Sequence, residues 1–503
     1  MRIIHFLIKR NLILVFVLII ILAGSAFCQN RGNNLSFQSL FSENLLGVKA
    51  LAMGGAYTAQ TGDVSSLFYN PAGLSDLPKI QVNVAGNYNT ELWREFQEWR
   101  PDRLFVTLPF YLTGRAPLDP KYDGQLDTAR VRDPNYVIAP PKMGLDPYSR
   151  EAADWQKTIN KFAINYIAVA VPFALFDYKI GAAASYNRQN IFDYDRNNTF
   201  LDPYIGYFGY GAIPQVNGKD TLSFSWNNFY RQRIGFLNNV PLGFGVEVIE
   251  NLKIGVGANI SWGKTTDYQG LVRIGNFSLI DKQKFKFYHI NYDVETNGQS
   301  TYNSMKFNFG LVYSFNRVNV AVNVVLPYTL TRKWDYTTVT TNSLSSISKN
   351  ETGTDKLKLP AVTTFGVTFN PVDKVIISFD FEYAPYSKAT FDQSKPDSTF
   401  HSLPDRNSYR FGVEYKVTKW MSLLSGYQNV PELFIPDGAA NKNRGPAWDS
   451  YSFGLSFNSE YGRIDASYEW KQLKYYDSYY SNANYQLEIN NNIVLGYSYS
   501  FDL

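Results

Sequence analysis

Histidine and cysteine, which supply much of the nucleophilic, acid–base and metal chemistry of proteins, are scarce in this chain of 503 residues. Cys28 is the only cysteine, and His289 and His401 are the only histidines beyond the N-terminal segment. Neither a Ser, His and acid set nor a cluster with metal-ligand spacing is evident. The glycines of Gly243-Phe244-Gly245 do not stand at a strand-to-helix turn, as those of a phosphate loop do. We therefore predict no enzyme activity, no cofactor and no metal.

Residues 47–77 form the most informative segment, because small residues and turn formers are concentrated there. Asn can cap a helix and Pro can occupy its first position, so an Asn-Pro turn has a fixed shape. We interpret the segment as a small plug that gates a channel. The alternative is that these residues only make a tight turn. The predicted gating residues are Gly54, Gly55, Asn70, Pro71, Ala72 and Gly73.

The elements that must hold this plug are strands, because apolar and polar residues alternate from residue 80 to the C-terminus. Val375, Ile377 and Phe379, for example, alternate with Ile376 and Ser378. An even number of strands, each long enough to cross a tilted bilayer path, predicts an all-β, 14-stranded antiparallel transmembrane β-barrel. A set of soluble β-sandwich domains is the alternative. The predicted strands lie near 80–88, 162–173, 176–188, 240–249, 252–264, 304–315, 318–328, 357–369, 374–384, 407–416, 419–428, 450–458, 462–472 and 491–503.

Short turns alternate with long polar segments between these strands, as in outer-membrane barrels with short periplasmic turns and long external loops. The first external segment, 89–160, is the longest, and we expect short helices in it near 91–100 and 150–159. The other external loops are predicted near 189–239, 265–303, 329–356, 385–406, 429–448 and 473–490.

The N-terminus has the features of a secretory signal peptide. Arg2, Lys9 and Arg10 precede the apolar run 12–22, and small residues lead to a cleavage site near 26–28. Removal of these three positive charges lowers the formal net charge from +4 to +1, so the charge gives no indication of a nucleic-acid partner. We predict a multi-pass protein of a Gram-negative outer membrane.

Three domains follow from these boundaries: a signal peptide over 1–28, an N-terminal plug over 29–78 and a transmembrane barrel with long external loops over 79–503. A lipid anchor on Cys28 is an alternative, although Phe27 stands where a small residue is expected. The predicted partners are a hydrophobic or amphiphilic small molecule, outer-membrane lipid and the barrel-assembly machinery during biogenesis. We expect a monomer.

If the apolar faces point to lipid, charged residues of both signs point into the lumen. Buried charges must be paired or hydrated, so we expect a wet, salt-bridged interior that does not favour passage of an apolar ligand along its axis. The expected inward residues are Asp380, Glu382, Arg410, Glu414, Lys416, Arg463, Asp465, Glu469 and Lys471.

The strand near 162–173 departs from the alternation, because residues 162–171 are apolar on both faces. Such a pattern indicates either a β-bulge or an apolar patch inside the barrel. It is explained by a strand that the plug covers, or by an apolar passage or lateral exit. The candidate residues for the passage or exit are Ile164, Ile167, Val169, Gly181, Ala182 and Ala183.

The segment Met53-Gly54-Gly55-Ala56, followed by Phe68-Tyr69-Asn70-Pro71-Ala72-Gly73-Leu74, resembles the FadL/TodX family of outer-membrane transporters for hydrophobic compounds. The likeness in sequence is clear only in this segment. It implies a 14-stranded barrel with an N-terminal hatch that contains Asn70, Pro71 and Ala72. It also implies uptake of long-chain fatty acids or other hydrophobic molecules by capture at external loops, hatch movement and lateral exit near the third strand.

Two other functions stay open. The first is a structural or shuttle barrel of a protein secretion system, of the type IX kind, that transports no small molecule. The second is a general diffusion porin, against which the plug argues.

Overall fold

The computed structural model describes residues 37, 39–41, 45–97, 155–176, 178–202, 215–216, 219–280, 284–394, 403–436, 439–479 and 482–502. The expectations for residues 1–28 and for His401 therefore lie outside the described residues. His289 lies in a strand, β7. No helix in the described part of the chain is long and apolar enough to cross a membrane.

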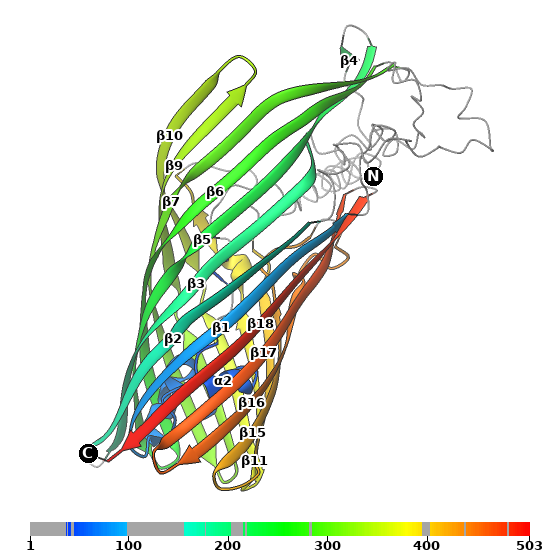
Figure 1. Cartoon of the computed structure of the whole chain (residues 1–503). Coiled ribbons are helices and arrows are strands. Elements are labelled where there is room, and N and C mark those ends of the chain that lie inside the picture. Colours follow the sequence, from blue (N-terminus) through cyan, green and yellow to red (C-terminus); the bar gives the residue numbers. More distant parts are fainter. Residues whose placement is uncertain are drawn as a thin grey trace, which may run out of the picture.

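Fourteen strands form a closed antiparallel wall (Figure 1), which confirms the predicted barrel. The ring closes where β1 pairs with β18, from Ile80 opposite Phe501 to Gln97 opposite Asn484. Each predicted strand overlaps one of these wall strands. Their bounds are β1 Ile80–Gln97, β2 Trp155–Leu175, β3 Tyr178–Asp202, β5 Lys219–Ile249, β6 Leu252–Ile280, β7 Lys284–Phe315, β8 Val318–Val325, β11 Val362–Val372, β12 Val375–Ala384, β14 Arg406–Lys416, β15 Met421–Pro431, β16 Ala447–Ser459, β17 Gly462–Tyr479 and β18 Asn482–Phe501.

The alternation of side chains gives the wall an apolar outer belt. On β7, for example, Phe307, Phe309 and Leu311 are exposed outward, while the residues between them face the lumen. A closed barrel with such a belt is the architecture of outer-membrane proteins, and closure satisfies the backbone hydrogen bonds that lipid cannot. The predicted outer-membrane localisation is confirmed.

The short turns lie at one end of the barrel, as predicted. Asn251 and Asn316 adopt φ values of 67° and 53° in two of them, a left-handed conformation that Asn tolerates better than most residues. These turns join β5 to β6 and β7 to β8.

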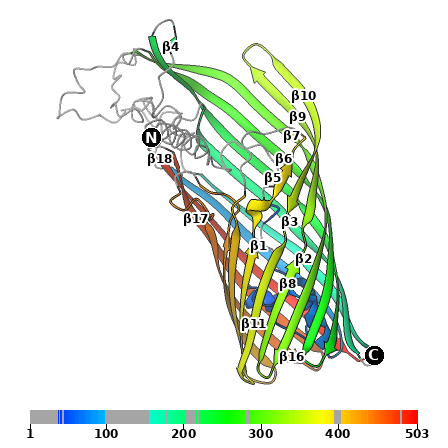
Figure 2. The same cartoon turned by 180° about the vertical axis from the view of Figure 1, so that it is seen from behind.

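At the other end several wall strands continue well beyond the belt (Figure 2). The prediction of external loops at 189–239 and 265–303 is therefore wrong for most of these residues, which belong to β3, β5, β6 and β7. The loop predicted at 329–356 is mostly a hairpin of β9 (Tyr328–Asn342) and β10 (Ser346–Leu359) that extends the sheet through β7. The expected helices are also wrong where they are described, because Glu91 and Trp155 lie in strands β1 and β2.

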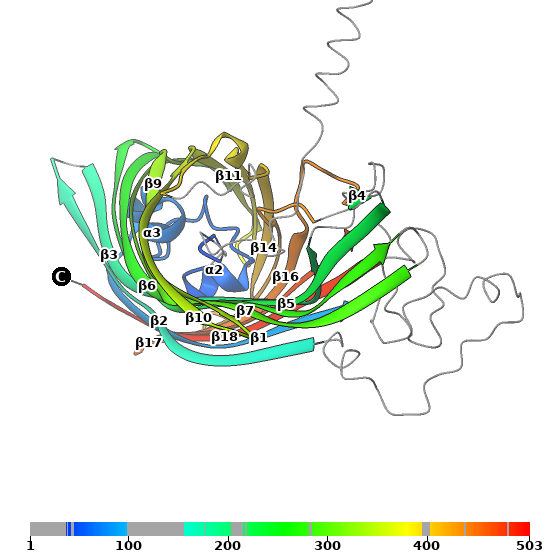
Figure 3. The same ribbon diagram turned by 90° about the horizontal axis from the view of Figure 1, so that it is seen from above.

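Smaller elements complete the external end and fill the lumen. β4 (Gln215–Val216) pairs with β5, and β13 (Thr390–Asp392) pairs with β10. Inside the ring lie α2 (Val48–Ala52), α3 (Ser66–Tyr69) and the 3₁₀ helix η1 (Pro71–Asp76), as Figure 3 shows from above for α2 and α3. A second 3₁₀ helix, η4 (Tyr386–Lys388), follows β12.

Candidate functional site

The plug, defined here as residues 47–77, fits closely against the inner wall. Gly54 and Gly55 have φ values of 62° and 75°, which side chains with a Cβ rarely adopt. A Cβ on Gly54 would also lie 2.7 Å from the backbone nitrogen of Tyr427 on β15. The glycine pair is therefore required both by the turn and by the approach to the wall.

Asn70 is fully buried, and it links the plug to the wall strand β7 and, by a longer contact of 3.5 Å with the Val322 carbonyl oxygen, to β8. Its Oδ1 accepts a hydrogen bond from the Ala72 backbone nitrogen at 3.1 Å, which caps η1 with Pro71 at the first position. Its Nδ2 donates to the carbonyl oxygens of Thr58 at 3.1 Å and Leu311 at 3.2 Å. Asn70 therefore shapes the turn and also attaches it to β7.

Glycines on three neighbouring strands make room for this turn. A Cβ added to Gly245 or Gly255 would overlap the backbone of Pro71 and Ala72, and one on Gly310 would overlap Asn70. Gly73 packs within the plug, where a Cβ would lie 2.7 Å from the Gln60 carbonyl oxygen. The wall of β5, β6 and β7 is therefore shaped to fit the Asn-Pro-Ala turn.

Polar contacts attach the plug to the opposite wall. Lys49 Nζ lies 2.7 Å from Glu414 Oε2, and Asp380 Oδ2 accepts hydrogen bonds from the Tyr57 and Thr58 backbone nitrogens at 3.0 and 2.9 Å. Asp380 and Glu414 are buried lumen residues, as the sequence predicted. Removing one partner of a buried ion pair costs several kcal/mol, so these contacts hold the plug firmly.

Asp63 forms a further buried pair, with Arg463 NH2 2.9 Å from its Oδ2. Burial alone would raise the pKa of Asp63, but the Arg463 guanidinium and a hydrogen bond involving Ser65 lower it to about 2. Arg463 also contacts Asp465 at 2.8 Å. Three of the charged lumen residues, Asp380, Glu414 and Arg463, thus bind the plug, while others pair within the wall, as Arg410 does with Glu382 and Lys471 with Glu469.

The residues proposed for an apolar passage divide between the two faces of the wall. On β2 the inward residues are Tyr166, Ala168 and Ala170, which pack against the plug together with Ala183, and Gly181 faces the Leu74 backbone. Ala182 is half-buried. Ile164, Ile167 and Val169 are instead 61%, 43% and 41% exposed on the outward face.

A seam in the wall lies beside these outward residues. β2 pairs with β3 only from Tyr166 opposite Asn187 down to Leu175 opposite Tyr178. Above that point, β2 pairs with β1 and β3 pairs with β5, and the two strands separate (Figure 1). A bulge at Asn165 marks the transition. The strand whose residues 162–171 are apolar on both faces therefore contains a β-bulge, which is one of the two explanations given by the sequence analysis.

Side chains bridge the seam where backbone hydrogen bonds are missing. Lys161 Nζ lies 4.8 Å from the ring centroid of Phe192, and Trp155 Nε1 donates to the Arg196 carbonyl oxygen at 3.0 Å. Phe162 on the outer side of β2 is 78% exposed, more than its neighbours in the belt. We call the unpaired stretch between residues 155–165 of β2 and 188–196 of β3 the seam.

A cavity of about 470 Å³ lies above the plug. Phe37, Phe41 and Leu403 line one part of it, and Phe37 and Leu403 belong to a larger apolar cluster within the external half of the barrel. Trp93 and Phe192 line the part nearest to the seam. The cavity therefore extends from this apolar cluster to the seam.

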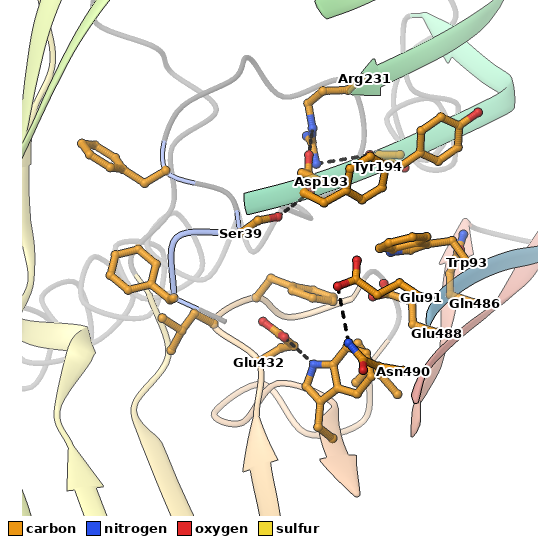
Figure 4. A pocket seen from close by; sticks show the side chains of 18 of the residues that line it. Ser39, Glu91, Trp93, Asp193, Tyr194, Arg231, Glu432, Gln486, Glu488 and Asn490 are labelled. Atoms are coloured by element: carbon orange, nitrogen blue, oxygen red, sulfur yellow. Dashed lines mark hydrogen bonds and ion pairs between the residues drawn. The ribbon is translucent and has the colours of Figure 1, made fainter. Parts of the chain in front are cut away.

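Another part of the cavity, next to Trp93, is polar, and the sequence analysis does not identify it. Glu91, Glu432, Glu488 and Asn490 line it (Figure 4), together with Gln428. The sequence had assigned most of these positions to loops, whereas Glu91, Gln428 and the two residues of β18 lie on strands. The inward alternation of Gln486, Glu488 and Asn490 is the signal that could have identified it.

Comparisons with known proteins agree with this architecture. The toluene transporter TodX of P. putida has a TM-score of 0.54 at 12% identity, with 92% of this chain and 100% of that chain covered. A Pseudomonas aeruginosa FadL homologue has a TM-score of 0.54 at 14% identity, with 91% and 98% covered. The family model BamG matches residues 204–429. No curated protein sequence matches. The predicted likeness to FadL and TodX is therefore confirmed as a shared fold.

Proposed function

We propose that this chain, which has the fold of TodX and of the FadL homologue, takes up hydrophobic or amphiphilic small molecules such as long-chain fatty acids across the outer membrane. In this proposal a molecule enters the cavity from the external end and leaves sideways through the seam between β2 and β3. The plug blocks the axial path, and its movement admits the molecule to the seam. The proteins with a similar fold include a toluene transporter and a monoaromatic hydrocarbon channel, which supports the class of substrate.

The seam is the observation that carries the proposal. An apolar molecule gains no hydrophobic stabilisation along a wall of paired charges, whereas lateral exit transfers it directly to lipid. The seam can open without breaking backbone hydrogen bonds between its two strands, whereas two fully paired neighbouring strands of the wall cannot separate in this way. Because Trp93 and Phe192 line the cavity at the seam, the route from the cavity is short.

The test is a reversible bridge across the seam. Lys161→Cys and Phe192→Cys place two thiols where the side chains now meet, and Cys28, in the predicted signal peptide, is the only native cysteine. A short bifunctional thiosulfonate reagent links the thiols, and a reductant releases them. We expect uptake of radiolabelled oleate and toluene by cells producing the variant to fall on bridging and to recover on reduction.

The control places the bridge on a fully paired joint. Leu423 and Leu455 lie directly opposite each other on β15 and β16 and face outward, so Leu423→Cys with Leu455→Cys reacts without closing any exit. Uptake that persists through the bridged seam would exclude lateral exit at this place. Uptake that never exceeds that of cells without the protein would exclude transport of these probes.

A structural barrel within a protein machine is the second candidate. The match of residues 204–429 to the BamG family supports it, because that name refers to the barrel-assembly (BAM) machinery. Mild-detergent purification of the full chain from its native membrane distinguishes the two functions. A stoichiometric protein partner, with no uptake of either probe, would support this second function over the first.

A further inference from the structure

The polar part of the cavity contains more carboxylates than cations to match them. Arg231 is 2.8 Å from Asp193, Arg332 is 3.5 Å from Asp355, and Lys471 is 3.3 Å from Glu469. Each of these three basic groups thus has an acid partner. Of the other two cations of the lining, Arg406 lies 3.4 Å from Glu382, and Arg94 donates to Gln156 Oε1 at 2.8 Å. In the described part of the chain, no salt bridge involves the remaining carboxylates, those of Glu91, Glu432 and Glu488.

Two of these three carboxylates accept hydrogen bonds from neutral groups only. Glu432 Oε1 accepts from Trp448 Nε1 at 2.6 Å, and Glu91 Oε1 accepts from Asn89 Nδ2 at 2.7 Å. Lys161 and Lys471 both act electrostatically on Glu91. Lys161 stands over the ring of Phe192, however, and Lys471 is paired with Glu469. Within the described chain, no residue donates a hydrogen bond to the Glu488 carboxylate.

Unpaired oxygen atoms face the same cavity. Gln428 is 1% exposed, and its Nε2 donates to Glu469 Oε1 at 2.9 Å. Because a carboxylate can only accept, this bond fixes the amide so that Oε1 points away from Glu469, and that oxygen has no partner in the described structure. The Oδ1 of Asn490 is likewise unpaired, and Ser450 Oγ, in a residue 1% exposed, has no partner either.

These groups share one chemical requirement. Carboxylates and amide oxygens accept hydrogen bonds, so a ligand must supply donors and, best, a positive charge. Trp93 and Trp448 also line the cavity, and an indole face attracts an organic cation. Burial and the negative charges of Glu432, Asp193 and Glu91 raise the pKa of Glu488 well above its ordinary value, so its charged form needs a cation beside it. This residue lies on β18 outside the apolar belt, which begins at Ile493.

A bound metal ion does not fit the arrangement. No three His, Cys, Asp or Glu side chains of the described residues are placed so that they could share a metal ion. The cavity of about 470 Å³ is also far larger than an ion needs. Its apolar part, with Phe37, Phe41 and Leu403, instead suits an alkyl or aryl group.

We infer that this cavity binds amphiphiles with an ammonium head group, whose charge lies among Glu91, Glu432 and Glu488 and whose apolar body lies against Phe37 and Phe41. The inference rests on the proposed uptake of amphiphilic molecules and specifies their head group. It places fatty acid carboxylates among the weaker ligands, because their charge repels the same three carboxylates.

The test compares three ligands that differ only in the head group. Hexylammonium, hexanoate and 1-hexanol are titrated calorimetrically into the purified full chain in detergent, with protein-free micelles as the blank. We expect hexylammonium to bind at least tenfold more tightly than hexanoate. Glu488→Gln is expected to weaken hexylammonium binding about tenfold and to leave 1-hexanol binding unchanged, since one charge-assisted interaction is lost.

A matched control comes from another carboxylate of the cavity lining. Glu351 has Lys349 at 2.6 Å as its partner, so Glu351→Gln should leave hexylammonium binding unchanged. Equal or tighter binding of hexanoate, or unchanged binding of hexylammonium to Glu488→Gln, would overturn the inference alone. Displacement of hexylammonium by calcium chloride, with heat of its own, would assign the site to an ion instead. Failure of all three ligands to bind would overturn the proposed uptake as well.

Discussion

Asn70→Ala is the change that tests most directly whether the plug is held by its turn. The substitution removes three hydrogen bonds of 3.1–3.2 Å, to the Ala72 nitrogen and to the carbonyl oxygens of Thr58 and Leu311. A net contribution of about 1 kcal/mol for each gives a loss of about 3 kcal/mol. The buried groups left without partners add to this value, so it is a lower estimate.

The loss appears as faster hydrogen exchange in the plug. Because 1.4 kcal/mol corresponds to a tenfold change, about 3 kcal/mol predicts exchange roughly 100-fold faster in peptides covering residues 66–77. Exchange in the wall strands stays unchanged, since their ladder hydrogen bonds are not touched. Mass spectrometry of peptides from the full chain in detergent measures both, and a heat-modifiable band on a gel verifies the barrel.

Asn319→Ala is the graded control for this measurement. Asn319 makes one comparable bond, from its Nδ2 to the Ala59 carbonyl oxygen at 3.1 Å, so about 1 kcal/mol and roughly fivefold faster exchange are expected near residue 59. If Asn70→Ala changes exchange over 66–77 by no more than Asn319→Ala does near residue 59, the turn does not hold the plug, and the reasoning from its hydrogen bonds fails.

Four further outcomes are expected. Deletion of residues 47–77 should leave a folded, heat-modifiable barrel with a larger conductance in planar bilayers, and failure of this variant to assemble would make the plug a scaffold. The pKa of Asp63 is lowered to about 2 from its ordinary value of 3.8. The stabilisation from its pair with Arg463, about 2 kcal/mol, is therefore present above pH 4 and is lost as the pH falls towards 2. Channel openings should become more frequent over that pH range, and Asp63→Asn should abolish this pH dependence. Phe379→Pro should prevent barrel formation, since it removes a ladder donor in lipid, and normal assembly would contradict the strand assignment there. Lys161→Met should speed hydrogen exchange over residues 155–165 about fivefold, as a contact of about 1 kcal/mol across the seam is lost, whereas Lys306→Met, away from the seam, should not.

The wall could be predicted from the sequence because lipid imposes a strict pattern. Wherever a strand crosses the belt, every second residue must be apolar, as in Val375, Ile377 and Phe379 of β12. Turn residues such as Asn251 and Asn316 then separate the strands at the end of the barrel with the short turns. The Asn-Pro-Ala turn was identifiable for a different reason: the shape of the turn requires these residue types.

Above the belt this constraint is absent, and the prediction of strands and loops is inaccurate there. Arg231 of β5 meets Asp193 and Asp195 of β3 across an external joint, and such polar pairs leave no alternation of apolar and polar residues. The strands there appear in sequence as polar loops. The polar part of the cavity was hidden for a further reason, because Glu91 and Glu488 become neighbours only through the register of β1 on β18 across the closure of the barrel.

The strength of the contacts also bears on the route of the proposed uptake. The plug is held by several buried interactions on opposite walls, including those of Asp63, Asp380 and Asn70, and freeing it completely would cost the sum of many terms of 1–5 kcal/mol. The seam is bridged by side-chain contacts such as that of Lys161 with Phe192, worth about 1–2 kcal/mol each. A small shift of the plug with an opening of the seam therefore costs less than expulsion of the plug, which favours lateral exit over an axial pore.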